Sequence, residues 1–197
     1  MKKVCSIAML ALAALAFQSC GGAGSNNDSA ANADSANYTK DTSSNAVETG
    51  GIAVVNDDAE FAVSAANAGM AEVELSKLAL TKATNAKVKE FADMMVKDHT
   101  GVNEKLMALA KTKNITLPTT VGADEQKTMA DLQAKSGADF DKAYVDVMVK
   151  DHKKAVDLFE DGSKDLKDAD LKSFATQSLP ALKSHLQAIE TIEKGVK

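Results

Sequence analysis

Arginine is absent from this chain of 197 residues, and cysteine occurs only twice. The 23 basic residues are therefore all lysines, and 28 acidic residues bring the formal net charge to −5. A negative chain without arginine, the bidentate phosphate donor, is poorly suited to nucleic acid, so we expect no nucleic-acid partner. The sequence also has no phosphate-binding loop, nucleophile elbow or CxxC motif. Nothing in it points to serine or cysteine catalysis.

Both cysteines, Cys5 and Cys20, lie within the first twenty residues. Lys2 and Lys3 precede an apolar run over residues 7–17, which is too short to anchor the chain across a bilayer. The run ends just before Cys20, in an arrangement that resembles a bacterial lipobox. We predict a lipoprotein signal peptide over residues 1–19 and a lipid on Cys20. The alternative is an ordinary signal peptide that is cut nearby.

The predicted lipid has consequences for the location of the protein. It would attach the protein to a membrane of the bacterial cell envelope, with the outer membrane favoured, and place the domain in the periplasm or at the surface. Residues 20–56 are rich in Ser, Ala, Asn and Gly, and such a segment buries too little apolar surface to order itself. We therefore expect a flexible tether, roughly 30–35 Å from end to end as a random coil. No protein partner is indicated.

Residues 57–197 place apolar residues at alternating spacings of three and four, with no strand pattern. This pattern predicts helices over about 57–83, 85–113, 139–162 and 168–192, with Gly162 ending the third and Pro180 kinking the fourth. The long connection 114–138, with a short helix at about 124–135, can carry the chain back along the bundle, so that the second and third helices run parallel. The expected fold class is an all-α four-helix bundle.

One strongly polar residue interrupts the apolar stripe of each predicted helix: Glu72, His99, His152 and His185. A buried charge without a partner costs on the order of several kcal/mol, so we expect these residues to satisfy one another, through hydrogen bonds or around a metal. Three imidazoles and a carboxylate suit one divalent transition metal, Zn, Fe, Mn or Cu. Helix lengths bring Glu72 and His99 to within about 5 Å in height, but leave His185 about 10 Å deeper than His152.

Two of these histidines end segments of nearly identical sequence, residues 93–99 and 146–152. Within the repeat, Met95 and Met148 stand one turn before the histidines. As thioether ligands they would favour copper, although core packing is the favoured interpretation. Asp98 and Asp151 lie about 100° off the buried stripe. Either could orient a histidine ring, although solvation at the surface is favoured.

Taken together, these stretches resemble the domain-of-unknown-function 4142 family of exported, ferritin-like proteins. The resemblance rests on Phe61 with residues 69–75, on 88–92 and 95–99, on 140–145 with His152, and on 179–182 with His185 and Leu186. It covers about residues 57–194. It implies a ferritin-like four-helix bundle with a crossover between the second and third helices, and it brings no known activity.

A ferritin di-iron site needs Glu-x-x-His pairs and further carboxylates. Here Val96, Val149 and Leu182 stand three positions before the histidines, and only Glu72, with Glu74 in reserve, supplies a carboxylate. This composition argues against a ferroxidase, and no enzymatic activity is expected. We expect an envelope-tethered bundle that binds one transition-metal ion. The alternative is a structural or protein-interaction module without metal, in which the polar layer fixes the register of the helices.

Overall fold

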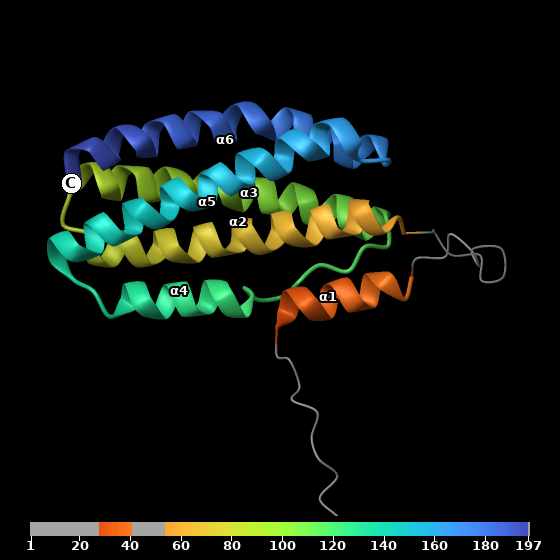
Figure 1. Ribbon diagram of the computed structural model, residues 1–197, viewed down its shortest axis with the longest axis horizontal. Helices are drawn as coiled ribbons and strands as arrows, with labels where there is room; N and C mark the ends of the chain where they lie inside the picture. Colours follow the sequence, from red (N-terminus) through yellow and green to blue (C-terminus); the bar gives the residue numbers. More distant parts are fainter. Residues whose placement is uncertain (1–27, 41–53, 197) are drawn as a thin grey trace, which may run out of the picture.

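The computed structural model describes residues 28–40 and 54–196, which form helices and connections without a β-strand (Figure 1). The expected all-α class is therefore confirmed for this part of the chain. Four helices are long, as the apolar spacing predicts, and α6 continues through Pro180. The six helices are α1 (Ser29–Tyr38), α2 (Asn56–Lys82), α3 (Ala86–Thr112), α4 (Ala123–Gln133), α5 (Gly137–Asp165) and α6 (Ala169–Val196).

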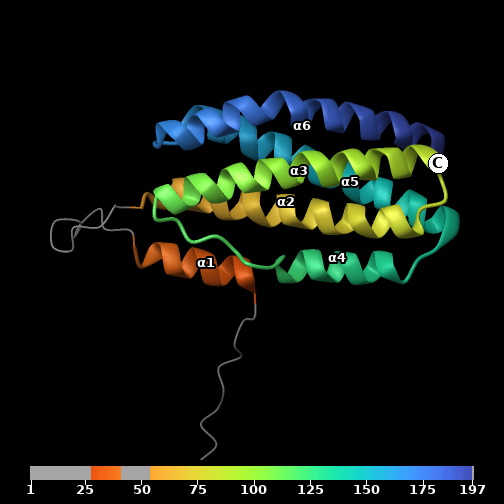
Figure 2. The same cartoon turned by 180° about the vertical axis from the view of Figure 1, so that it is seen from behind.

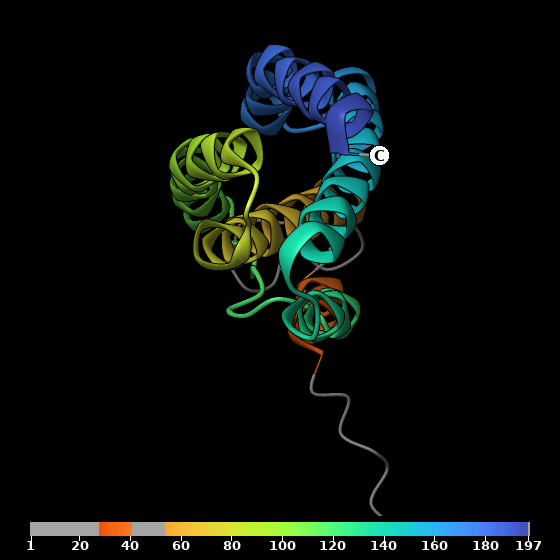
Figure 3. The same ribbon diagram turned by 90° about the vertical axis from the view of Figure 1, so that its left-hand side faces the viewer.

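The long helices form two hairpins that pack against each other. α2 pairs with α3 and α5 pairs with α6, while α2 also lies against α5 and α3 against α6. Seen end-on, the four helices surround a common core, and α1 and α4 lie outside it (Figure 3). The connection that carries α4 returns the chain along the bundle, so α3 and α5 run in the same direction (Figure 1). From behind, α1 and α4 follow one another along the same side of α2 (Figure 2).

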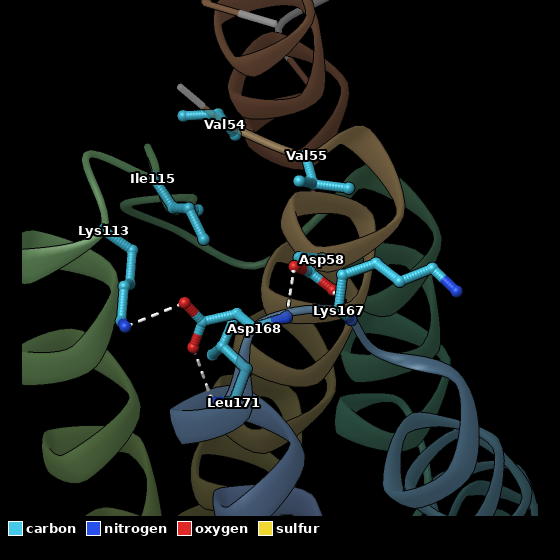
Figure 4. A pocket seen from close by; sticks show the side chains of 8 residues that line it. All are labelled: Val54, Val55, Asp58, Lys113, Ile115, Lys167, Asp168 and Leu171. Carbon is cyan, nitrogen blue, oxygen red and sulfur yellow. Dashed lines mark hydrogen bonds and ion pairs between the residues drawn. The ribbon is translucent and has the colours of Figure 1, made fainter. Parts of the chain in front are cut away.

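A buried aspartate near the start of α2 ties this helix to the turn between α5 and α6 (Figure 4). Asp58 accepts hydrogen bonds from the backbone amides of Lys167 and Asp168, each at 2.8 Å. Asp168 in turn caps α6 by accepting from the amides of Asp170 and Leu171, and it pairs with Lys113 at the end of α3. Charge-assisted hydrogen bonds of this kind fix the end of the bundle.

The opposite end of the bundle has the same device. Asp141, buried near the start of α5, accepts from the backbone amides of Thr84 and Asn85 in the turn between α2 and α3, each at 2.9 Å. Asn85 then caps α3, as Asp168 caps α6. The same offset in residue number relates Asp141 to Asp58 and Asn85 to Asp168. The two hairpins are thus similar units, and each supplies the aspartate that holds the turn of the other.

The sequence predicted that the third long helix ends at Gly162, but the helix continues beyond this residue. α5 continues to Asp165, and Gly162 serves close packing instead. A Cβ at this position would lie 2.7 Å from the ring of Phe61, which packs edge-on against Phe159 at 5.2 Å between centroids. Because α5 is one turn longer than expected, His152 lies deeper below the α5–α6 turn. The expected height difference of about 10 Å from His185 was therefore too large.

Part of the predicted tether is also ordered. Residues 29–38 form α1, which is capped by Asp28 and packs against α2. Asn37 is buried and exchanges two hydrogen bonds with the backbone of Thr116, at 2.7 and 2.8 Å. This partner is remote in sequence, which is why composition alone indicated a coil. The predicted signal peptide, Cys20 and the rest of the tether lie outside the described residues. Within residues 28–40 and 54–196, no helix combines the length and apolar character that a membrane span requires.

Candidate metal centre

Each long helix contributes one polar side chain to the middle of the bundle. The four side chains are almost wholly buried, with exposed fractions between 0 and 5%. An apolar cluster that contains Phe61 and Phe159 lies on one side of them, and a second cluster, with Phe140 and Tyr144, lies on the other. The structure therefore places in one layer the residues predicted from the interrupted stripes: Glu72 on α2, His99 on α3, His152 on α5 and His185 on α6.

The three histidine rings form a nearly equilateral triangle. The distances between ring centroids are 5.6 Å for His99 and His152, 5.4 Å for His99 and His185, and 5.7 Å for His152 and His185. One nitrogen from each ring lies within 4.8 Å of the other two. His185 is thus a full member of the layer, although its predicted height had set it apart.

Each ring is fixed in place by a contact that one of its two nitrogens makes with a neighbouring oxygen. The holding group is a carboxylate for two of the rings and a backbone carbonyl for the third. The contacts join His99 Nδ1 to Glu72 Oε2 at 2.9 Å, His152 Nδ1 to the carbonyl oxygen of Met148 at 2.9 Å, and His185 Nε2 to Asp98 Oδ2 at 3.1 Å. Outer contacts of this kind fix the tautomer and orientation of metal-binding imidazoles.

The other nitrogen of each ring has no hydrogen-bond partner. These atoms are His99 Nε2, His152 Nε2 and His185 Nδ1, and all three are buried. Buried polar atoms are nearly always satisfied, because an unpaired one costs about 1–3 kcal/mol. One partner shared by the three adjacent rings would satisfy all of these atoms. A metal ion that accepts three imidazole nitrogens fits this donor set.

Glu72, which was expected to be a ligand, lies on the held side of the rings. Its Oε2 contacts Nδ1 of His99, and its Oε1 lies 3.3 Å from Nδ1 of His152. The side chains whose ligand atoms lie within 4.8 Å of one another are the three histidines, and the assignment of Glu72 as a further ligand stays a prediction. Oε1 has no hydrogen-bond partner, because Nδ1 of His152 pairs with the Met148 carbonyl. Glu72 therefore orients the ring of His99 by a hydrogen bond and acts on His152 through its charge.

Burial and the Glu72 charge divide the histidines by pKa. Burial disfavours the imidazolium form of His99, but the Glu72 carboxylate outweighs it and raises the pKa of this residue. Burial prevails at the other two rings and lowers the pKa of His152 and of His185, with repulsion from His99 adding to it. For Glu72, burial is outweighed by the three histidines, so its pKa is lowered. The carboxylate is therefore ionised at neutral pH.

Asp98 contacts His185, a role that the sequence left as the less favoured interpretation. It was expected mainly at the solvated surface, but it is 42% exposed and its inner oxygen holds His185 across the α3–α6 contact. The repeated Asp-His pair was the available signal, since Asp151 occupies the same place before His152. Asp151 has a different role. Burial and the nearby Glu72 charge raise the pKa of Asp151 to about 6.

Met95 and Met148 are both fully buried within the apolar cluster of Phe140 and Tyr144. This is the core packing that the sequence favoured. Met148 also supplies the backbone carbonyl that holds His152. Its contribution to the layer thus comes from the main chain.

Comparison with known proteins places the chain in a family. The family model described as "Domain of unknown function (DUF4142)" matches residues 42–192. The chain belongs to this family. The expected membership is therefore confirmed, and it brings no assigned activity to this DUF4142 protein. A search of curated proteins gave no match.

Two solved structures resemble this DUF4142 protein in fold. CopM in the Cu(II)-bound form superposes with a TM-score of 0.61 and 12% identity, over 71% of this chain and 97% of the other. CopM in the Ag-bound form gives a TM-score of 0.57 and 13% identity, over 70% and 96%. At this level of identity the likeness concerns the helical fold.

Proposed function

We propose that this protein is a lipid-anchored helical protein of the bacterial cell envelope that binds one transition-metal ion, and that copper is the preferred ion. The ligands would be His99, His152 and His185. The observation that carries the proposal is the set of three buried, unpartnered ring nitrogens, each opposite a nitrogen held by another group. In this arrangement one ion would satisfy three polar atoms at once.

The spacing of the rings supports a shared ion. Two nitrogens bound to one metal at about 2.0–2.1 Å lie at most about 4 Å apart. One nitrogen from each of the three rings lies within 4.8 Å of the other two, so an inward movement of less than about 1 Å per ring would complete the site.

Copper is favoured by the donor set and by the structural neighbours. Imidazole nitrogens suit copper, zinc and iron, and Cu(II) binds most tightly among the divalent first-row ions. The neighbouring CopM structures hold Cu(II) and Ag. Buried aliphatic and aromatic side chains lie on both sides of the histidine layer. A buffering or storage role suits a single buried ion better than a catalytic one.

We further propose that the bundle is ferritin-like in topology. Two antiparallel hairpins joined by a crossover, with α3 and α5 parallel, support this proposal (Figure 1). The chemistry of ferritin does not follow, because Val96, Val149 and Leu182 occupy the positions where the Glu-x-x-His pairs would need glutamate. We propose no enzymatic reaction.

The anchor proposal gains a geometric consequence from α1. Asp28, the cap of α1, lies eight positions after Cys20. Eight residues reach at most about 29 Å, even when fully extended. A lipid on Cys20 would therefore keep the start of α1 within about 29 Å of the membrane. Because α1 packs on α2, the bundle would be held near the membrane with it. This distance is shorter than a free tether up to residue 56 would allow.

A structural module without metal is the second candidate, and the Glu72–His99 contact of 2.9 Å favours it. A buried ion pair of this kind can fix the register of the helices without a ligand. In that case His99→Gln and His152→Gln would change stability and leave metal affinity absent in every variant.

The test is a titration of the metal-free protein with Cu(II), Zn(II), Fe(II) and Mn(II). We expect one ion per chain, tightest for copper, with binding lost in His99→Ala and His152→Ala. Glu74→Gln is the control for a substitution outside the histidine layer, because Glu74 lies on the same helix as Glu72 but is 46% exposed. Absence of binding tighter than about micromolar for all four ions would overturn the proposal.

A further inference from the structure

A groove between α3 and α6 leads from the surface to two of the three histidines. It has a volume of about 410 Å³. Its lining comes from α3 and α6 and includes His99 and His185. Asp98 is the one carboxylate in that lining, beside the two lysines Lys97 and Lys105, and Gly101, Ser178 and Ala181 are its small residues. A Cβ built at Gly101 would meet no atom within 4 Å, so the space above this glycine is open.

The groove reaches two of the three histidines and not the third. His99 and His185 line it, although each is at most 5% exposed overall. His152 is 0% exposed and does not line it, and the ring of Phe91 packs against it edge-on at 5.8 Å between centroids. An ion that arrives through the groove therefore meets His99 and His185 first and His152 last.

The other side of the layer is covered. Glu72 and His152 come from α2 and α5, and on that side α1 and α4 lie over the bundle (Figure 3). A second hollow lies farther along the seam between α3 and α6, where Phe91, Met94 and Ser184 line it, and it does not reach His99 or His185. Of these two hollows, the first is the one that reaches the histidine layer.

We propose that the metal ion reaches and leaves its site through this α3–α6 groove, and that it is bound in the order His99 and His185, then His152. The proposal rests on the proposed metal-binding function. Asp98 marks the mouth, because its carboxylate is 42% exposed and its inner oxygen contacts His185. A half-exposed carboxylate at this position gives an incoming cation a first oxygen contact before it loses its water.

The experiment narrows the groove and measures rates. Ala181→Leu adds bulk to the α6 wall, and Ser184→Leu adds a comparable side chain one turn farther along the same helix, in the second hollow. Gly101→Leu and Gly195→Leu form another pair, since neither glycine has an atom within 4 Å of a built Cβ and Gly195 is remote from the groove. Stopped-flow spectroscopy of the full chain follows Cu(II) loading and its release into excess EDTA.

We expect Ala181→Leu and Gly101→Leu to slow loading and release together by about tenfold, with the dissociation constant for Cu(II) within about twofold of the wild type. Ser184→Leu and Gly195→Leu should leave both rates unchanged. Equal slowing by Ser184→Leu, or unchanged rates in both groove variants, would overturn the route. Failure of the wild type to bind Cu(II) would instead overturn the proposed function, so the two failures are distinct. Circular dichroism confirms that each variant is folded before its rates are compared.

Discussion

Replacing Glu72 by glutamine distinguishes two roles for this residue: a contact that supports the histidines, and a ligand of the metal itself. The carboxylate lies 2.9 Å from Nδ1 of His99 and 3.3 Å from Nδ1 of His152, on the side away from the unpartnered nitrogens. Glutamine keeps the shape and one acceptor oxygen but removes the charge. We therefore expect Glu72→Gln to bind Cu(II) in the same geometry, with weaker affinity because both imidazoles become less basic.

The size of the effect follows from comparable outer contacts. Losing such a carboxylate typically weakens metal binding by about 10–100-fold, which corresponds to about 1.4–2.7 kcal/mol. A competition titration with a chelator of known affinity resolves this range. Electron paramagnetic resonance of the Cu(II) form should show the same number of coupled nitrogens in Glu72→Gln and wild type. Glu74→Gln, at an exposed site two residues later, should change neither quantity.

Two results would refute this reasoning. If Glu72→Gln abolished Cu(II) binding as completely as His99→Ala, or changed the resonance spectrum to that of a site with one donor fewer, Glu72 would be a ligand, as the sequence first suggested. If the variant bound Cu(II) with wild-type affinity, the carboxylate would have no influence on the rings it contacts.

Three further predictions concern other parts of the molecule. Asp141→Ala should lower the free energy of unfolding by about 2–4 kcal/mol in urea titrations, because it removes the charged acceptor of two part-buried amides in the α2–α3 turn. The metal-free protein should be most stable near pH 6.5 in thermal melts between pH 5 and 8. Below this pH the lowered pKa values of His152 and His185 make the unfolded state bind more protons, an effect that the raised pKa of Asp151 opposes below about pH 6. Above it the raised pKa of His99 makes the folded state bind more protons. Cys20→Ser should release the protein from the membrane fraction, and wild-type protein that stays soluble in a lipoprotein-processing host would contradict the anchor.

Helix periodicity predicted much of the fold because it depends on local spacing. The interrupted apolar stripes placed Glu72, His99, His152 and His185 on the inner faces, and the structure brings all four together. The depth of His185 was wrong because Gly162 was taken as a helix end. A glycine that ends a helix and a glycine that admits a phenylalanine ring look the same in a sequence, and only the partner helix distinguishes them.

Contacts between distant segments could not be predicted in the same way. Asp98 holds His185 because α3 and α6 lie side by side at a particular rotation, which no spacing within α3 specifies. Helix α1 depends on Asn37 and its partner Thr116, far along the chain. The side of the imidazole rings that Glu72 contacts was open for the same reason. These features follow from packing between helices, and the sequence contained only hints of them, such as the Asp28 cap before α1.

The central claim is that His99, His152 and His185 together hold one metal ion, and native mass spectrometry tests it most directly. Metal-free protein is exposed to one and then several equivalents of Cu(II), beside the variant in which all three histidines are alanine. We expect one retained copper ion per wild-type chain at every ratio and none in the variant. Wild-type protein without copper, or a variant that retains as much copper as the wild type, would contradict it.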